Sequence, residues 1–258
     1  MIRVWVLLFW LAGCASTSAP LPEPSFDEPE TLNRASSLAG NLAGLNLSLT
    51  PFTHMGGSVS PVRAELLAAE QRYLPYLLKT TLTESGFWGA VRVTPGVDVT
   101  AELNCQGQLL SASAAALQLR LICRDALGRS WLDDRFDTRI ARDTYGQAAV
   151  DGPDPYRPIM VRIANRLADG LTRLTDQDRQ RLRDAALLRY AQSLSPEGFD
   201  GYLAINAEGE MQVQGLPASS DPMIARVRRI RDSEYQFIDA MDEQYRLIYQ
   251  QMNAPYRL

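Results

Sequence analysis

The fold is decided by residues 97–123, VDVTAELNCQGQLLSASAAALQLRLIC, in which apolar and polar side chains alternate in two successive runs. A period of two is typical of a β-strand that buries one face. The first run extends from Val97 to Leu109 and the second from Leu117 to Cys123. We therefore predict two long antiparallel strands joined by a turn about Ala114.

This hairpin places Cys105 opposite Cys123, with both side chains on the apolar face. A redox-active pair would favour close spacing near a helix start and access to solvent, which these positions do not offer. We predict a structural cross-strand disulfide, and two packed free thiols are the alternative.

The neighbouring segments complete an α+β domain over residues 45–174. Asp125-Ala126-Leu127-Gly128-Arg129 predicts a turn into a third strand, Ser130–Ile140, which gives an antiparallel three-stranded meander. Upstream we expect a strand at 45–49, a helix at 61–85 with a kink or break at Pro75, and a short strand at 90–94. Asp154-Pro155 is typical of a helix start, and an apolar stripe follows to Leu174. The expected fold is a mixed sheet, containing the meander, packed by two helices.

Residues 175–258 predict a mainly helical extension with a small hairpin, after a soft boundary near 175. Thr175-Asp176-Gln177-Asp178 resembles a capping box that begins a helix ending near Leu194. Leu203–Val213 is expected to form a hairpin across Glu208-Gly209. Asp221-Pro222 then begins the longest helix, 222–252, whose apolar positions step by threes and fours.

The beginning of the chain predicts where in the cell the protein is located. A short positive start and the apolar run 4–11 lead into Leu11-Ala12-Gly13-Cys14, which resembles the lipobox of bacterial lipoprotein signals. The resemblance implies a signal peptide over 1–13, cleavage before Cys14, and lipidation of Cys14 as the membrane anchor. An ordinary signal or an uncleaved anchor is the alternative, but the apolar run is far below the about 20 residues that span a bilayer.

Residues 14–44 are rich in Pro, Ser, Ala and acidic residues, so we expect a flexible tether after the lipidated cysteine. In Gram-negative lipoproteins an aspartate after the cysteine tends to retain the protein at the inner membrane, and this chain has Ala15. The resemblance therefore implies the periplasmic face of the cell outer membrane.

Composition excludes several function classes. The formal net charge is −4 and no basic block is present, which argues against nucleic acid as a partner. The chain has one histidine, His54, expected in a loop, which removes most catalytic and zinc-site designs. The carboxylates of Asp125, Asp133, Asp134 and Asp137 suggest a cation site at first sight, but adjacent strand residues point to opposite faces. We expect no catalytic, cofactor-binding or metal-binding residues, and the chain is predicted not to be an enzyme.

The long helix allows two interpretations. Its apolar stripe packs on the first domain and on the 176–194 helix, or its tyrosine-rich far end (Tyr235, Phe237, Tyr245, Tyr249 and Tyr256) projects as a partner-binding arm. Its arginine run is by default a solvated, salt-bridged face. The residues predicted to touch a partner are Arg228, Arg229, Tyr245 and Tyr249.

The element order over 45–174 and the turn Asp125-x-x-Gly128-Arg129-x-Trp131 resemble envelope lipoproteins with the fold of the TolB N-terminal domain. That fold is shared with the curli secretion lipoprotein and the lipoprotein activators of penicillin-binding proteins. The resemblance implies a non-catalytic accessory or assembly module that binds protein or cell-wall partners, and we expect an envelope protein partner. An envelope hydrolase and a passive structural lipoprotein that forms a homo-oligomer are the alternatives.

Overall fold

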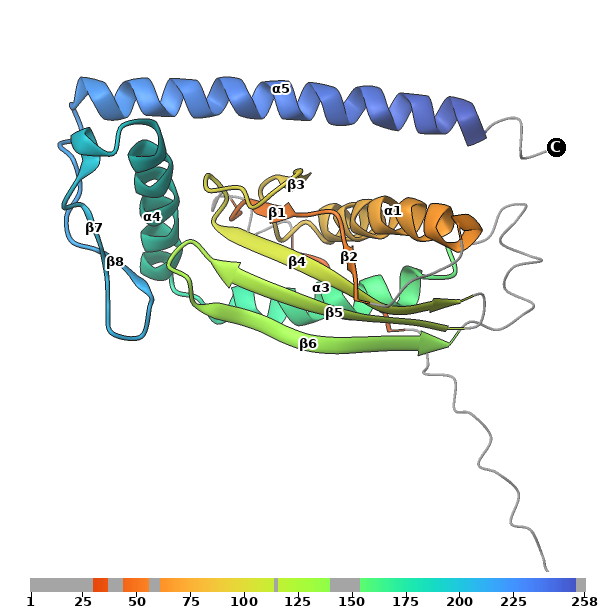
Figure 1. Ribbon diagram of the computed structural model, residues 1–258. Helices are drawn as coiled ribbons and strands as arrows, with labels where there is room; N and C mark the ends of the chain where they lie inside the picture. Colours follow the sequence, from red (N-terminus) through yellow and green to blue (C-terminus); the bar gives the residue numbers. More distant parts are fainter. Residues whose placement is uncertain (1–29, 37–43, 56–60, 114–115, 140–153, 254–258) are drawn as a thin grey trace, which may run out of the picture.

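The computed structural model describes residues 30–36, 44–55, 61–113, 116–139 and 154–253 (Figure 1). Cys14, the signal segment and most of the predicted tether lie outside the described residues. None of the described helices is both long and apolar enough to cross a bilayer.

The centre of the molecule is a mixed six-stranded sheet. Its strands follow the order β3-β1-β4-β5-β6, and β2 pairs with β4 beside β1. β1 runs parallel to β3 and β4, whereas β4, β5 and β6 form the predicted antiparallel meander. The strand bounds are Leu47–Leu49 (β1), Thr53–His54 (β2), Val91–Val93 (β3), Leu103–Ser113 (β4), Ala116–Asp125 (β5) and Ser130–Arg139 (β6).

Two helices cover one face of this sheet, as the alternation predicts. They are α1 (Pro61–Ser85) and α3 (Arg157–Thr172), and their apolar residues share one buried cluster with the strands. α1 is a single helix that contains Pro75, rather than two abutting helices. Gly107 lies against the ring of Phe52, where an added Cβ would meet ring carbons at 2.3 Å, so a glycine is required at this point of β4.

The prediction that the first long strand begins at Val97 is wrong, because β4 begins at Leu103. Residues before it form turns around Asp98, whose carboxylate accepts the Thr100 amide at 2.8 Å. The Asp98 amide in turn donates to the Asn104 side chain at 2.9 Å. These local hydrogen bonds offer the backbone an alternative to the sheet ladder.

Two further boundaries differ from expectation. α3 begins at Arg157 rather than at Asp154-Pro155, because Asp154 closes a turn before the helix: its carboxylate accepts the Tyr156 amide and its carbonyl accepts the Arg157 amide. His54 lies in the two-residue strand β2, paired with Leu109, and not in a loop.

The extension after residue 175 contains the predicted helices and hairpin. α4 (Asp176–Leu194) has the capping box of Thr175 and Asp178, and the 3₁₀ helix η2 (Glu197–Phe199) follows. β7 (Leu203–Ile205) pairs with β8 (Met211–Val213), and α5 spans Pro222–Asn253. Figure 1 shows α4 at one end of the sheet, with the β7–β8 hairpin beyond it and α5 running back past α1.

Part of the segment predicted as a tether lies against the domain. Leu32 packs on the main core, the Asn33 amide donates to the Asn165 side chain at 2.8 Å, and the Ala35 amide donates to the Ser85 carbonyl at 2.9 Å. Residues 30–36 therefore contact both α1 and α3.

Candidate functional site

The first turns of α5 are anchored by apolar packing. Ile224 and Val227 are buried in a cluster with Leu188 and Tyr190 of α4 and with Phe199. The Asp221 carboxylate caps the helix by accepting the Met223 amide at 2.7 Å. The interpretation in which α5 packs on the 176–194 helix is correct for this part.

The middle of α5 is held to the sheet by polar contacts. The Tyr235 hydroxyl donates to the Thr100 carbonyl at 3.0 Å, and burial raises the pKa of Tyr235 to about 12, so it remains a neutral donor. The Arg92 guanidinium lies 3.9 Å from the centre of the Tyr235 ring and pairs with both carboxylate oxygens of Asp239 at 2.7 Å. Tyr235 therefore belongs to the seam between α5 and the sheet, not to a projecting arm.

Further along, Lys79 of α1 pairs with Asp242 of α5. A gap of about 350 Å³ between these two helices is lined largely by polar side chains, Thr80, Thr83 and Glu84 among them. Beyond Val227, the described contacts of α5 with the first domain are thus mainly charged and polar.

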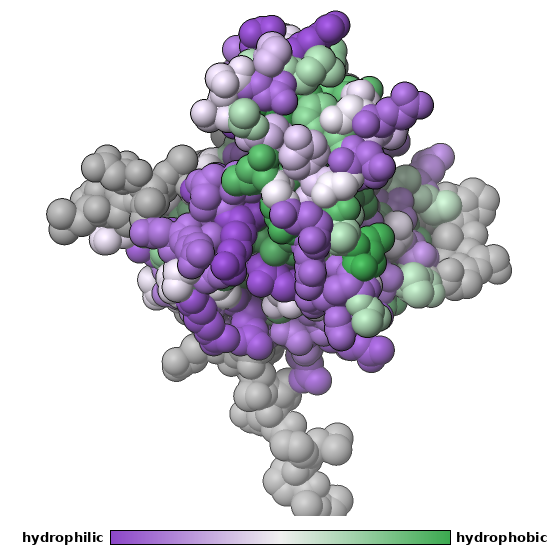
Figure 2. Space-filling model, turned by 90° about the vertical axis from the view of Figure 1, so that its left-hand side faces the viewer, coloured by the Kyte–Doolittle hydropathy of each residue, from purple (hydrophilic) through white to green (hydrophobic). Residues whose placement is uncertain are grey.

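The extension carries most of the exposed large apolar side chains in the described part of the chain. Of ten exposed large apolar side chains there, seven belong to residues 194–241. Four of them, which we call the α5 stripe, lie along α5: Met223, Ile230, Phe237 and Met241, with Phe237 68% exposed. Figure 2 shows apolar surface interrupting the polar surface on the face made by α4, the hairpin and the start of α5.

The structure describes the side chains of only two of the four residues predicted to bind a partner. Arg228 and Arg229 are exposed on α5. The side chains of Tyr245 and Tyr249 lie outside the described residues, although their backbone is helical. Of the α5 stripe, only Phe237 was named in the partner-binding arm. The spacing of seven, seven and four positions was the available signal for the other three residues, but the same spacing also fits a buried face.

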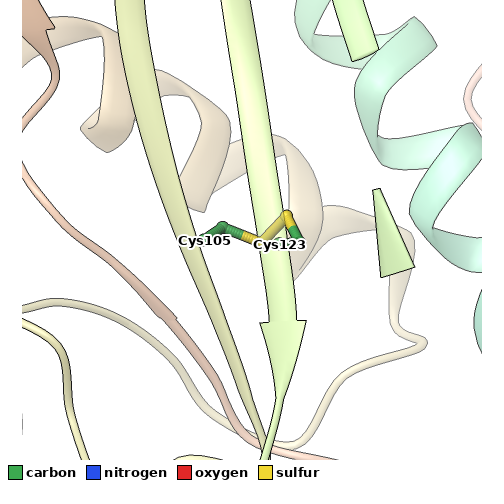
Figure 3. The surroundings of a disulfide bond; sticks show 2 residues. All are labelled: Cys105 and Cys123. Atoms are coloured by element: carbon green, nitrogen blue, oxygen red, sulfur yellow. A yellow bond between two sulfur atoms is a disulfide. The ribbon is translucent and has the colours of Figure 1, made fainter. Parts of the chain in front are cut away.

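The two cysteines form the predicted disulfide between β4 and β5 (Figure 3). Both are 0% exposed and belong to the main core. A buried position of this kind suits a structural cross-link rather than a reactive one.

Asp125 has a structural role that the sequence only hinted at through its turn motif. Its buried carboxylate accepts the amides of Leu127 and Arg129 through Oδ1, and Arg129 Nε and Trp131 Nε1 through Oδ2, at 2.8–3.0 Å. Gly128 completes the turn with a φ of 85°. The motif is therefore a closed hydrogen-bonding unit around one carboxylate.

The other carboxylates do not assemble a cation site. Asp133 pairs with Arg120 at 2.6 Å and Asp134 pairs with Arg166 at 3.5 Å. In the described ranges, no three His, Cys, Asp or Glu side chains are grouped so as to hold a metal ion.

Glu102 is buried, although the alternation of residues 97–109 would place it on the polar face of a strand. Its carboxylate accepts the Asn46 amide at 2.6 Å. Burial raises the pKa of Glu102, while that hydrogen bond and the charges of Arg231 and Arg183 act in the opposite direction.

No protein-family model and no curated protein matches this chain. Among solved structures, the hypothetical protein CT253 from Chlamydia trachomatis is similar over 49% of this chain and 93% of its own, with 10% identity and a TM-score of 0.28. A dodecameric PelC variant from Paraburkholderia phytofirmans is similar over 54% of this chain and 95% of its own, with 9% identity and a TM-score of 0.33.

Proposed function

We propose that the protein is a lipid-anchored, non-catalytic partner-binding module of the bacterial envelope, held by Cys14 at the periplasmic face of the outer membrane. The lipobox and Ala15 support this location. The cross-strand disulfide agrees with an oxidising compartment.

The observation that carries the binding role is the concentration of exposed apolar side chains on the extension. Scattered apolar residues need no explanation, but an aligned set marks an interaction surface. The α5 stripe follows one side of a helix whose other contacts fix it to the domain. Its periodicity suits an amphipathic partner helix, read at positions three, four and seven apart.

Charge adds to the chemistry of this partner. Arg226 and Arg229 are exposed beside the first half of the α5 stripe. We propose that the partner segment is an amphipathic helix of another envelope protein with acidic residues along its rim.

Two experiments test the proposal. Cys14→Ala should release the chain from membranes on fractionation and abolish incorporation of labelled palmitate; a variant that still fractionates with membranes contradicts the anchor. Pull-down from envelope extracts should recover a discrete protein with the wild-type chain and lose it with Phe237→Glu.

Gln236→Glu is the matched control, because it places the same charge one position away on an exposed site of the same helix. It should retain the partner. Equal recovery with both variants contradicts docking through the α5 stripe, and recovery of the chain's own copies alone favours a homo-oligomer over this proposal.

A further inference from the structure

A hollow of about 180 Å³ lies where the open face of the sheet meets the extension. Gln106, Ile122 and Arg124 of β4 and β5 line one side, and Arg189 of α4 and Met211 of β8 line the other. A cavity of roughly 150 Å³ accommodates a benzene-sized molecule. The hollow therefore has room for one functional group and a short side chain.

Two guanidinium groups border this hollow and are fixed on the same turn. Arg189 Nη1 donates to the Ala126 carbonyl at 3.4 Å, and Arg124 Nη1 donates to the Gly128 carbonyl at 3.3 Å. Neither arginine forms an ion pair with a carboxylate of the described residues. A guanidinium carries five N–H donors in a planar fork, so both retain donors for a ligand.

Arg189 is the less solvated of the two. Burial lowers its pKa, and the charges of Asp125 and Asp98 act against this. The Asp125 carboxylate is already committed to four donors of the turn. A partly buried cation without a close counter-ion is unfavourable, and an anion in the hollow would offset that cost.

Besides the two arginines, the lining contains the polar side chains of Asn104, Gln106 and Asp125 and an apolar wall made by Val97, Ile122, Ala126 and Met211. Val97 is 50% exposed at the rim, and Ile122 and Met211 lie beside the arginines. A planar carboxylate matches the fork of a guanidinium, and an apolar group attached to it would cover these side chains. Phosphate is polar on all sides and has no apolar group to pack against these side chains.

We propose that the hollow binds a carboxylate that carries a short apolar group, the chemistry of an apolar amino acid or of a peptide C-terminus. This site is independent of the α5 stripe and does not rest on the function proposed above.

The probe is N-acetyl-leucine, titrated into the full chain in detergent by isothermal titration calorimetry. We expect saturable binding with a Kd of about 1 mM or lower, as suits so small a ligand. N-acetyl-leucinamide has the same shape without the charge and should bind at least tenfold more weakly, and inorganic phosphate should not compete. Equal binding of acid and amide, competition by phosphate, or no binding of the acid would overturn the proposal.

Variants locate the site. Arg189→Gln should weaken binding of the acid at least tenfold, and Arg124→Gln, at an exposed position where the fold is not at risk, should do the same. Arg120→Gln is the control, because Arg120 lies on the same strand but is paired with Asp133. Unchanged affinity in both test variants, or an equal loss in the control, would show that the acid binds elsewhere.

Discussion

Replacing Asp125 by asparagine tests whether one buried carboxylate organises the turn between β5 and β6. The change keeps the size and shape of the side chain. Asparagine Oδ1 still accepts the amides of Leu127 and Arg129. Its Nδ2 group, however, presents a donor to Trp131 Nε1 and Arg129 Nε, where the carboxylate presented an acceptor.

The expected loss of stability depends on whether water can replace the carboxylate at each of these two donors. A hydrogen bond to a charged group contributes about 1.5–3 kcal/mol. The side chain of Arg129 is 39% exposed and can turn towards water, so its loss is partial. The Trp131 N–H has no such freedom while its ring packs on the core. Asp125→Asn should therefore lower the free energy of unfolding by about 2–4 kcal/mol.

Urea unfolding followed by circular dichroism measures this difference, with the midpoint lowered and the slope unchanged. Asp133→Asn serves as the control, because that carboxylate is exposed and its pair with Arg120 should matter little. A loss below about 1 kcal/mol in Asp125→Asn, or equal losses in the two variants, would refute the reasoning.

The remaining predictions concern the disulfide, Glu102 and the seam of α5. Joint replacement of Cys105 and Cys123 by alanine should cost about 3 kcal/mol in the loop-entropy account of an 18-residue separation, and thermal unfolding with and without reductant measures it. Because burial raises the pKa of Glu102, its charge destabilises the fold above that pKa, and the cost disappears as the pH falls towards 4.5. Glu102→Gln should thus be more stable than wild type at pH 7, with the gap closing near pH 4.5. Asp239→Asn, which leaves the Arg92 guanidinium (7% exposed) without its carboxylate, should cost about 1–3 kcal/mol in urea unfolding, since Asp239 itself is half-exposed.

The meander and its disulfide could be predicted from the sequence because their pattern is local. Alternation along β4 and β5 fixes which side chains face the core, and the register then brings Cys105 to Cys123. The start of β4 could not be predicted in this way. Asp98 offers its neighbours hydrogen bonds that compete with the sheet, and alternation alone does not reveal that competition.

The particular contacts that hold α5 on the first domain could not be predicted, for a different reason. Arg92 and Asp239 are 147 positions apart, and no spacing rule connects them. The same holds for Glu102, which is buried and within electrostatic reach of Arg183 of α4 and Arg231 of α5. The hollow bordered by Arg124 and Arg189 likewise exists only once the sheet and α4 have come together.

We propose that the α5 stripe is the surface through which this protein binds an envelope partner. The most direct measurement is photo-crosslinking in living cells from a reactive residue at Phe237, with Gln118 on the exposed sheet face as the control position. We predict one discrete envelope protein as the main adduct from Phe237 and its absence from Gln118. The same adducts from both positions, or only copies of this chain from Phe237, would contradict the account.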